Sequence, residues 1–191
     1  MTLELGNWIQ THTHRAFSLT TPDAADVTIE DIAHSLSQIC RFNGHTRVPY
    51  SVAEHSVRCS QLVDQDFALD ALLHDAGEAY FGDVSTPLKR ELGAAWADVE
   101  ERIGSLIADK FGVLWPPPRA VVNADLALLE IECRDLLGAA IDDWSKMGAM
   151  AVFKIDVDEL VIIEPWTPDF ARHRFLERYH TLMAKHCWRV V

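Results

Sequence analysis

Apolar residues recur at helical spacing through most of the chain, and polar signatures mark where helices begin. From Thr28 the apolar positions lie three and four apart, Thr28 and Asp31 resemble a capping box, and Gly44 follows the last of them. Ser51 and Glu54 form a second capping-box signature before another apolar stretch. We therefore expect one helix after Thr28 and a second after Ser51.

The middle of the chain carries longer helical patterns. Asp66 is placed to cap a helix that would run to a stop at Gly82. Thr86 with Pro87 is typical of an N-cap followed by proline at the first helical position, and the apolar stripe then continues to Gly112. These patterns predict two further helices.

The remaining segments are shorter or less regular. Residues 8–19 fit a short strand pair, and residues 142–159 show no clear period. The sequence also predicts a rigid connector at 115–118 and a helix at about 120–137. A short strand is expected at 160–163 and a final helix at about 168–187. No repeat or domain boundary is visible, so we expect a single all-α domain over 1–191 with a short N-terminal strand pair.

Composition and charge narrow the functional classes. The chain has 191 residues, 49% of them apolar, which is enough to bury a core. A net charge of −12 repels a polyphosphate backbone and argues against a binder of nucleic-acid polymers. No apolar run approaches the roughly 20 residues of a membrane span, and no signal-peptide pattern opens the chain. We expect a cytoplasmic protein without membrane contact, whose four cysteines are reduced core thiols.

Four ionisable residues interrupt the apolar stripes. His74 and Asp75 are adjacent inside one predicted helix, and His55 and Asp125 lie on two others. Buried carboxylates need partners because burial without them is costly. Two imidazoles and two carboxylates form a mixed ligand set that suits one Mn, Fe, Co, Ni or Zn ion, with positions left for water and substrate. The alternative is that the histidines are hydrogen-bonded core residues and the acids pair locally.

Other catalytic signatures are missing from the sequence. The stretch from His74 to Glu78 is not the HExxH zinc motif, because its fifth residue is glutamate. No GxSxG elbow, Walker A loop or GxGxxG fingerprint occurs either. Metal-assisted hydrolysis is therefore the reaction class that these residues fit best.

The order His55, His74-Asp75, Asp125 resembles the H…HD…D signature of the HD-domain phosphohydrolases, an all-helical superfamily of metal-dependent phosphoesterases. The surrounding sequence is similar to the bacterial 5'-deoxynucleotidase branch and most of all to its prophage-borne members. The similar stretches are 40–45, 51–56, 71–78, 82–89, 124–126, 132–136 and 165–168. The resemblance implies an HD-domain helical bundle whose metal-site core lies at about 28–137.

The resemblance also implies a role for each motif residue. One divalent ion would be held by His55, His74, Asp75 and Asp125, with a water on the ion placed to attack phosphorus. Glu78 would orient or deprotonate that water, or else it is a solvent-facing glutamate near a helix end. Asp83 resembles an acidic residue near the substrate sugar, or else it is a turn or N-cap residue.

We expect four further residues to contact the substrate: Arg41, which resembles a phosphate-binding arginine of that branch, Phe42, His45 and Lys89. Arg41 would bind the phosphate, or else complement the dipole of the preceding helix. Phe42 stands where the characterised deoxynucleotidases carry tryptophan, so the choice between ribose and deoxyribose stays open. His45 and Lys89 would add positive or donor groups near the phosphate, or else they occupy a turn and a solvated helix.

These inferences predict a divalent-metal-dependent phosphoric monoester hydrolase that removes the 5'-phosphate of (deoxy)nucleoside monophosphates. No histidine lies between Asp75 and Asp125, where binuclear relatives carry extra histidines, so the resemblance implies a single ion. Two alternatives keep the same site: a nucleoside triphosphate phosphohydrolase, and a nucleotide-sensing module without catalysis. We expect a small-molecule nucleotide as the substrate, and the relatives imply a homodimer.

Overall fold

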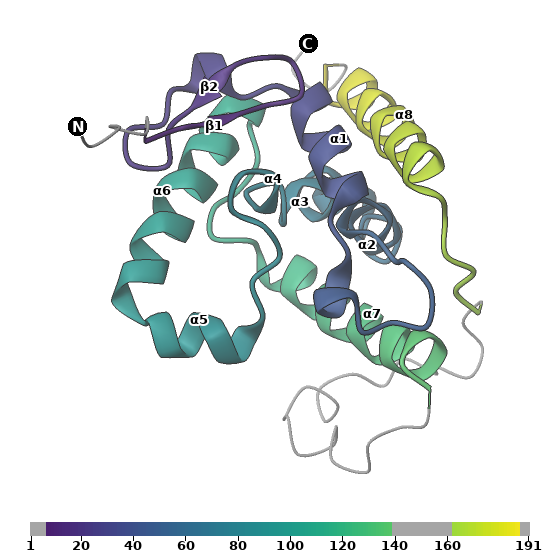
Figure 1. Cartoon of the computed structure of the whole chain (residues 1–191). Coiled ribbons are helices and arrows are strands. Elements are labelled where there is room, and N and C mark those ends of the chain that lie inside the picture. Colours follow the sequence, from purple (N-terminus) through teal and green to yellow (C-terminus); the bar gives the residue numbers. More distant parts are fainter. Residues whose placement is uncertain (1–6, 139–161, 188–191) are drawn as a thin grey trace.

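The computed structural model of the protein describes residues 7–138 and 162–187. Helices dominate it, with one two-stranded sheet near the N-terminus, so the predicted all-α fold with a short strand pair is confirmed. β1 (Ile9–Gln10) pairs antiparallel with β2 (Ala16–Phe17), which places Ile9 opposite Phe17. Figure 1 shows the helices that follow.

The two N-terminal helices begin where the capping signatures predict. The side-chain oxygen of Thr28 accepts a hydrogen bond from the backbone N–H of Asp31 at the start of α1 (Ile29–Gln38). Ser51 does the same for Glu54 at the start of α2 (Val52–Cys59). Two short 3-10 turns, η1 (Ala24–Asp26) and η2 (Arg41–Gly44), precede and follow α1.

The prediction of one helix from Asp66 to Gly82 is wrong in its middle. The segment forms a 3-10 turn and two short helices, η3 (Gln65–Phe67), α3 (Ala68–Leu73) and α4 (Glu78–Phe81), and Phe67 rather than Asp66 precedes α3. Between the helices the backbone bonds join residues three apart, as in the bond from Glu78 N–H to the Asp75 carbonyl. His74 and Asp75 therefore lie in a tightened turn.

The prediction of one helix from Thr86 to Gly112 is also wrong. The chain forms α5 (Thr86–Leu92) and α6 (Ala94–Phe111), and the N-cap position of α5 is Ser85 rather than Thr86. Gly93 separates the helices with φ +56° and ψ −130°, a conformation that residues with a Cβ avoid. The two helices form an angled pair on the left of Figure 1.

The C-terminal helices agree with the prediction. They are α7 (Arg119–Leu136) and α8 (Pro168–Cys187). Of the strand predicted at 160–163, residues 162 and 163 are irregular, and the rest of that segment lies outside the described residues together with 142–159. Among the helices that the structure describes, none combines the length and hydropathy of a membrane span.

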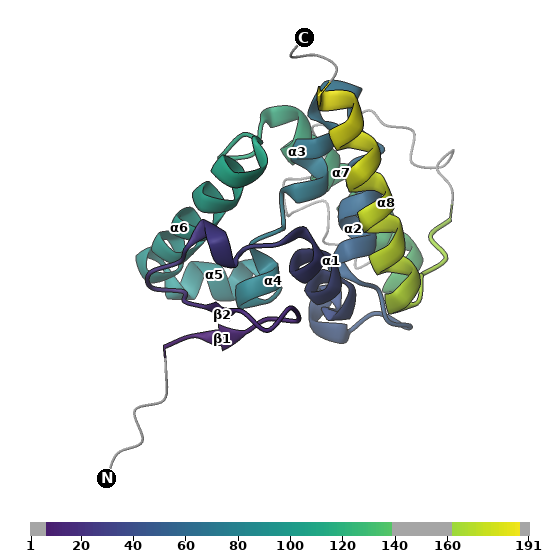
Figure 2. The ribbon, with the colours of Figure 1, turned by 90° about the horizontal axis from the view of Figure 1, so that it is seen from above.

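Two apolar clusters hold the helices together. One contains fully buried Phe17, Ile32 and Phe175, and the other contains Val121 and Leu128 of α7. α8 packs on α1, α2 and α3, and both views show it beside α1 and α2, away from α5 and α6 (Figures 1 and 2). Because α2 and α3 contribute to both clusters, the segments that carry His55 and His74 are anchored on two sides.

Candidate metal centre

Three segments bring the four predicted metal ligands together: α2, the turn before α4, and α7. The Nε2 atoms of His55 and His74 are 3.4 Å apart, and Nε2 of His55 is 3.2 Å from Oδ1 of Asp125. Ligand atoms of these three residues all lie within 4.8 Å of one another, so the group could hold a metal ion. Oδ2 of Asp75 lies 3.2 Å from Nε2 of His74 and 3.6 Å from Nε2 of His55.

The donor set fits a divalent ion. Two imidazole nitrogens that bind one ion at about 2.1 Å are roughly 3.0–3.4 Å apart in octahedral or tetrahedral geometry, and the two Nε2 atoms are 3.4 Å apart. The other nitrogen of each ring already has a partner. Nδ1 of His74 bonds the Ala71 carbonyl at 2.8 Å, and Nδ1 of His55 bonds Glu132 at 2.6 Å. Both rings therefore present Nε2 to the same point.

The electrostatics of the cluster favour a positive charge at this point. Burial and Arg41 act to lower the pKa of His55, but Glu132 and Asp125 outweigh them and raise it to about 9. Burial acts to raise the pKa of Asp75, but His74, His55 and Arg41 lower it far below its usual range. The acids stay ionised and attract cations, which suits a site for a divalent ion.

Glu132 is a fully buried carboxylate behind the cluster. It accepts hydrogen bonds from Tyr50 Oη at 2.8 Å, from His55 Nδ1 at 2.6 Å, and from Nε and Nη2 of Arg41 at 3.2 and 3.1 Å. Burial acts to raise the pKa of Glu132, but Arg41 and His55 lower it below its ordinary value. Nη1 of Arg41 lies 3.6 Å from Oδ2 of Asp75, so this guanidinium faces the cluster instead of the end of α1.

Sequence reasoning did not assign a role to Glu132 or Tyr50. A signal for Glu132 was present, because it follows Asp125 by seven residues and so lies on the same face of one helix two turns later. No local pattern marks Tyr50, whose bond to Glu132 depends on the tertiary fold.

The two predicted catalytic acids lie near the cluster. Glu78 is 6% exposed, and its Oε2 atom has no hydrogen-bond partner among the described residues. Burial raises the pKa of Glu78 well above its usual value, and Asp75 and Asp83 raise it further. The alternative of a solvent-facing Glu78 is therefore wrong. Asp83 is half-buried, and burial raises its pKa against the opposing effect of Arg41.

The predicted substrate-binding residues differ in how close they lie to the cluster. Lys89 bonds Glu100 at 2.9 Å and lines a small cavity together with Glu78. The ring of Phe42 lies 5.5 Å from Cζ of Arg41, and its φ of +55° is unusual for a residue with a side chain. His45 is exposed, and no described contact joins its ring to the cluster.

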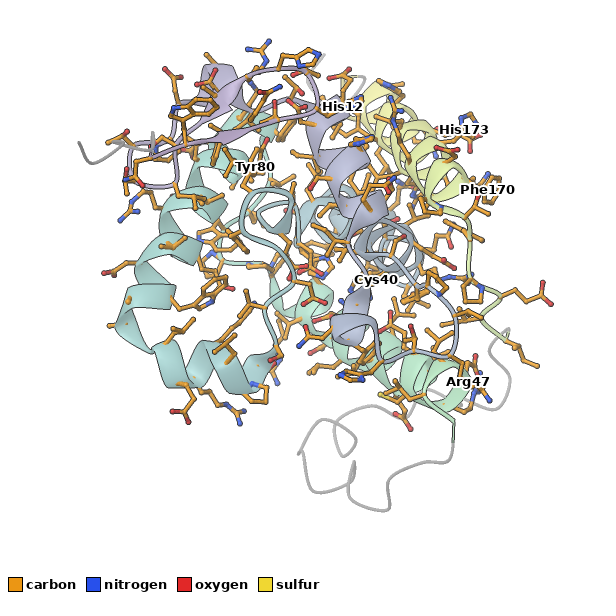
Figure 3. The ribbon with its side chains drawn as sticks, in the orientation of Figure 1. His12, Cys40, Arg47, Tyr80, Phe170 and His173 are labelled. Atoms are coloured by element: carbon orange, nitrogen blue, oxygen red, sulfur yellow. The ribbon has the colours of Figure 1, made fainter. Side chains whose placement is uncertain are left out.

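The loop that carries Arg41 is tied to α7. Figure 3 shows Cys40 at its start and Arg47 farther along it, near the end of α7. Nη2 of Arg47 donates to the Asp135 carbonyl at 2.6 Å, and the Arg47 backbone N–H donates to the Leu136 carbonyl at 3.1 Å. These bonds fix the loop on the same helix that supplies Asp125. Cys40, Cys59 and Cys133 are free thiols; Cys59 and Cys133 are buried, as expected of core thiols, whereas Cys40 is only partly buried. The side chain of Cys187 lies outside the described residues.

A cavity of about 600 Å³ opens on the cluster and has the size of a small-molecule site. It is lined by His74, Asp75 and Asp125 of the cluster, by apolar residues that include Trp115, Pro116 and Val121, and by the acids Asp98, Glu100 and Glu101. Nε1 of Trp115 donates to Glu101 at 2.8 Å. A Cβ at Gly104 would be 2.2 Å from the indole, so only glycine lets this ring lie on α6. The sequence placed Trp115 in the rigid connector and gave it no role at the site.

Together, the fold and these side chains define a helical protein with a candidate histidine and aspartate metal centre. No family model matches the chain. It is 42% identical over 178 residues to the uncharacterized protein YfdR of Escherichia coli K12, covering 92% of this chain and 96% of that protein. It is 32% identical to the uncharacterized protein RCAP_rcc00048 of Rhodobacter capsulatus, covering 92% of this chain and 95% of that protein. The chain belongs to the same family as YfdR.

Proposed function

We propose that the protein is a divalent-metal-dependent phosphohydrolase that removes the 5'-phosphate of (deoxy)nucleoside monophosphates. The observation that carries the proposal is the convergence of two imidazoles and two carboxylates beside Arg41 and a buried glutamate. Three residues of the same cluster also line the cavity of about 600 Å³. Two histidines that were only hydrogen-bonded core residues would not need the carboxylates, the arginine or the cavity beside them.

His55, His74, Asp75 and Asp125 would hold the ion. Their two nitrogens and their carboxylate oxygens suit Mn, Fe, Co, Ni or Zn. When bound, such an ion lowers the pKa of water and neutralises charge on a phosphoryl group.

Arg41 and Glu78 supply the groups that phosphate hydrolysis needs from the protein. Nη1 of Arg41, which does not bond Glu132, faces Asp75 and can donate to a phosphate oxygen. The free Oε2 of Glu78 can accept a proton from the attacking water, because no described group competes for it. Asp83 and Lys89 lie close enough to act on the charge of Glu78, so both belong to the same neighbourhood.

The cavity favours a monophosphate over a triphosphate. The acids that line it would repel the additional phosphates of a nucleoside triphosphate, whereas Trp115, which also lines it, carries an indole on which a base could stack. In this proposal the phosphate of the nucleotide lies at the cluster, and the base lies along the indole of Trp115.

The test is phosphate release from a panel of deoxynucleoside and nucleoside mono- and triphosphates, with and without added Mn²⁺ or Co²⁺. We expect metal-stimulated release from monophosphates. Release of a longer phosphate product from triphosphates would favour the triphosphatase instead. Binding of nucleotides without release from any of them would favour the sensing module.

A further inference from the structure

We propose that Glu132 is a positioning residue of the metal centre, which fixes the nitrogen that His55 presents to the ion and also holds Arg41 in place. The second part rests on the proposed function, because it concerns the phosphate. The first part concerns metal affinity and can be measured without any catalysis.

The two oxygens of Glu132 accept from different neighbours. Oε1 accepts from His55 and Tyr50, and Oε2 accepts from two nitrogens of Arg41. A carboxylate paired with a guanidinium only accepts hydrogen bonds, so Nδ1 of His55 carries the proton in this contact. Nε2 is then the nitrogen left to bind the ion, and it lies 3.2 Å from Asp125.

One rigid element sets this arrangement. Asp125 and Glu132 are both on α7, so the same helix provides a proposed metal ligand and the residue that orients a second ligand on α2. The bond from His55 to Glu132 spans 77 residues and is fully buried. Carboxylates that hold the outer nitrogen of a ligating histidine fix the tautomer and ring orientation and make the ligand more basic.

The contact with Arg41 uses the planar geometry of the guanidinium. Nε and Nη2 both bond Oε2, which leaves Nη1 on the side of Asp75. If glutamine replaced Glu132, one acceptor oxygen would remain for the donors of Arg41, Tyr50 and His55. Both the histidine and the arginine would lose their fixed position.

A purely structural role makes a different prediction. If Glu132 only neutralises the buried Arg41, then its loss lowers stability but leaves the metal affinity of the folded protein unchanged. Metal affinity therefore separates the two roles, and activity alone does not.

The experiment measures Mn²⁺ binding to the full chain by calorimetry for the wild type and Glu132→Gln, with folding checked by circular dichroism. We expect Glu132→Gln to weaken Mn²⁺ binding on the order of 10- to 100-fold, and to raise KM for a nucleoside monophosphate. The matched control is Glu130→Gln, which removes the same charge from a partly exposed position of the same helix and should leave the Mn²⁺ affinity unchanged.

Glu132→Gln could fail to fold because Arg41 loses its partner. In that case Mn²⁺ binding is compared between Arg41→Met and the double variant Arg41→Met/Glu132→Gln. The double variant should bind Mn²⁺ more weakly than Arg41→Met alone. Equal Mn²⁺ affinity within either comparison overturns the inference, and so does a wild type that binds no divalent ion. If the wild type binds Mn²⁺ but hydrolyses no nucleotide, the proposed function is wrong. The positioning role of Glu132 is then still tested by the Mn²⁺ binding constants.

Discussion

The His55–His74 pair and the His12–His34 pair place similar side chains in very different settings. The rings of His12 and His34 stack with centroids 3.8 Å apart and planes 12° apart, so their in-plane lone pairs do not point at one spot. The rings of His55 and His74 are tilted by 51°, and their Nε2 atoms approach to 3.4 Å. Figure 3 shows His12 near the start of α1, close to the strand pair.

The carboxylates near the two histidine pairs also have different partners. Asp31, the acid near His34, is already bonded by the Thr13 backbone N–H, the Thr13 hydroxyl and the Thr28 hydroxyl, at 2.7, 2.7 and 2.8 Å. Burial lowers the pKa of His34, and His12 lowers it further. Asp75 and Asp125 instead face the ring nitrogens of the other pair directly. Two histidines form a candidate metal site only where their ring nitrogens and neighbouring carboxylates converge on one point.

The largest effect is expected when an acid of the cluster is removed. Asp75→Ala should abolish metal binding and reduce phosphate release by roughly 1,000-fold or more, because it deletes a ligand. Metal content by mass spectrometry and phosphate release measure the two effects. Asp64→Ala, an acid outside the site, is the control, and retention of full metal content in Asp75→Ala would remove Asp75 from the ligand set.

Glu78→Gln should separate catalysis from metal binding. Loss of a general base lowers kcat by about 100-fold or more, whereas glutamine keeps the shape of the side chain and leaves the four proposed ligands in place. Metal content should equal that of the wild type. A variant with unchanged kcat would show that Glu78 does not take the proton.

Trp115→Ala tests whether the nucleoside lies along the cavity wall. Loss of base stacking should raise KM on the order of tenfold with little change in kcat. Gly104→Ala should act in the same direction, because the added methyl group collides with the indole. Trp8→Ala removes an exposed tryptophan and serves as the control. A KM for Trp115→Ala equal to that of the wild type would place the nucleoside elsewhere.

Asp31→Asn should lower stability but not activity. Burial acts to raise the pKa of Asp31, but the bonds from Thr13 and Thr28 lower it below its ordinary value. A depressed folded-state pKa stabilises the protein above the unfolded pKa of about 3.9, and this contribution is lost as pH falls through the folded value. At pH 7 the variant should be less stable by about 1–2 kcal/mol, and the difference should shrink below about pH 4. Urea unfolding at several pH values measures it; a difference that does not vary with pH would contradict the assignment.

The smallest effect is expected at the stacked pair. His12→Ala should leave metal content and kcat unchanged, because its ring does not face the cluster. The same metal and phosphate assays check this outcome. Loss of metal from this variant would show that His12 contributes to metal binding, contrary to the geometry of its ring.

Local signals were enough to predict most helix starts and the four ligand candidates. Thr28 and Ser51 cap their helices as the sequence indicates, because capping depends on neighbours within three residues. The breaks at His74 to Gly77 and at Gly93 were missed. The turn at His74 keeps helical dihedral angles while its hydrogen bonds tighten, and an isolated glycine is often tolerated inside a helix.

The surroundings of the ligands were harder to predict. Glu132 reaches Arg41 across 91 residues, and Trp115 lies over Gly104 on a different element. Such contacts follow from packing, which periodicity along one chain does not encode. His45 shows the converse, since its place after Arg41 indicates a site residue but the turn directs it to solvent.

The proposed function depends on one divalent ion held by His55, His74, Asp75 and Asp125. Calorimetric titration of the metal-stripped chain with Mn²⁺, compared between the wild type and Asp125→Ala, measures whether the ion binds there. We expect one ion per chain for the wild type and no measurable binding for the variant. Equal stoichiometry and affinity in both proteins, or no binding to the wild type, would contradict it.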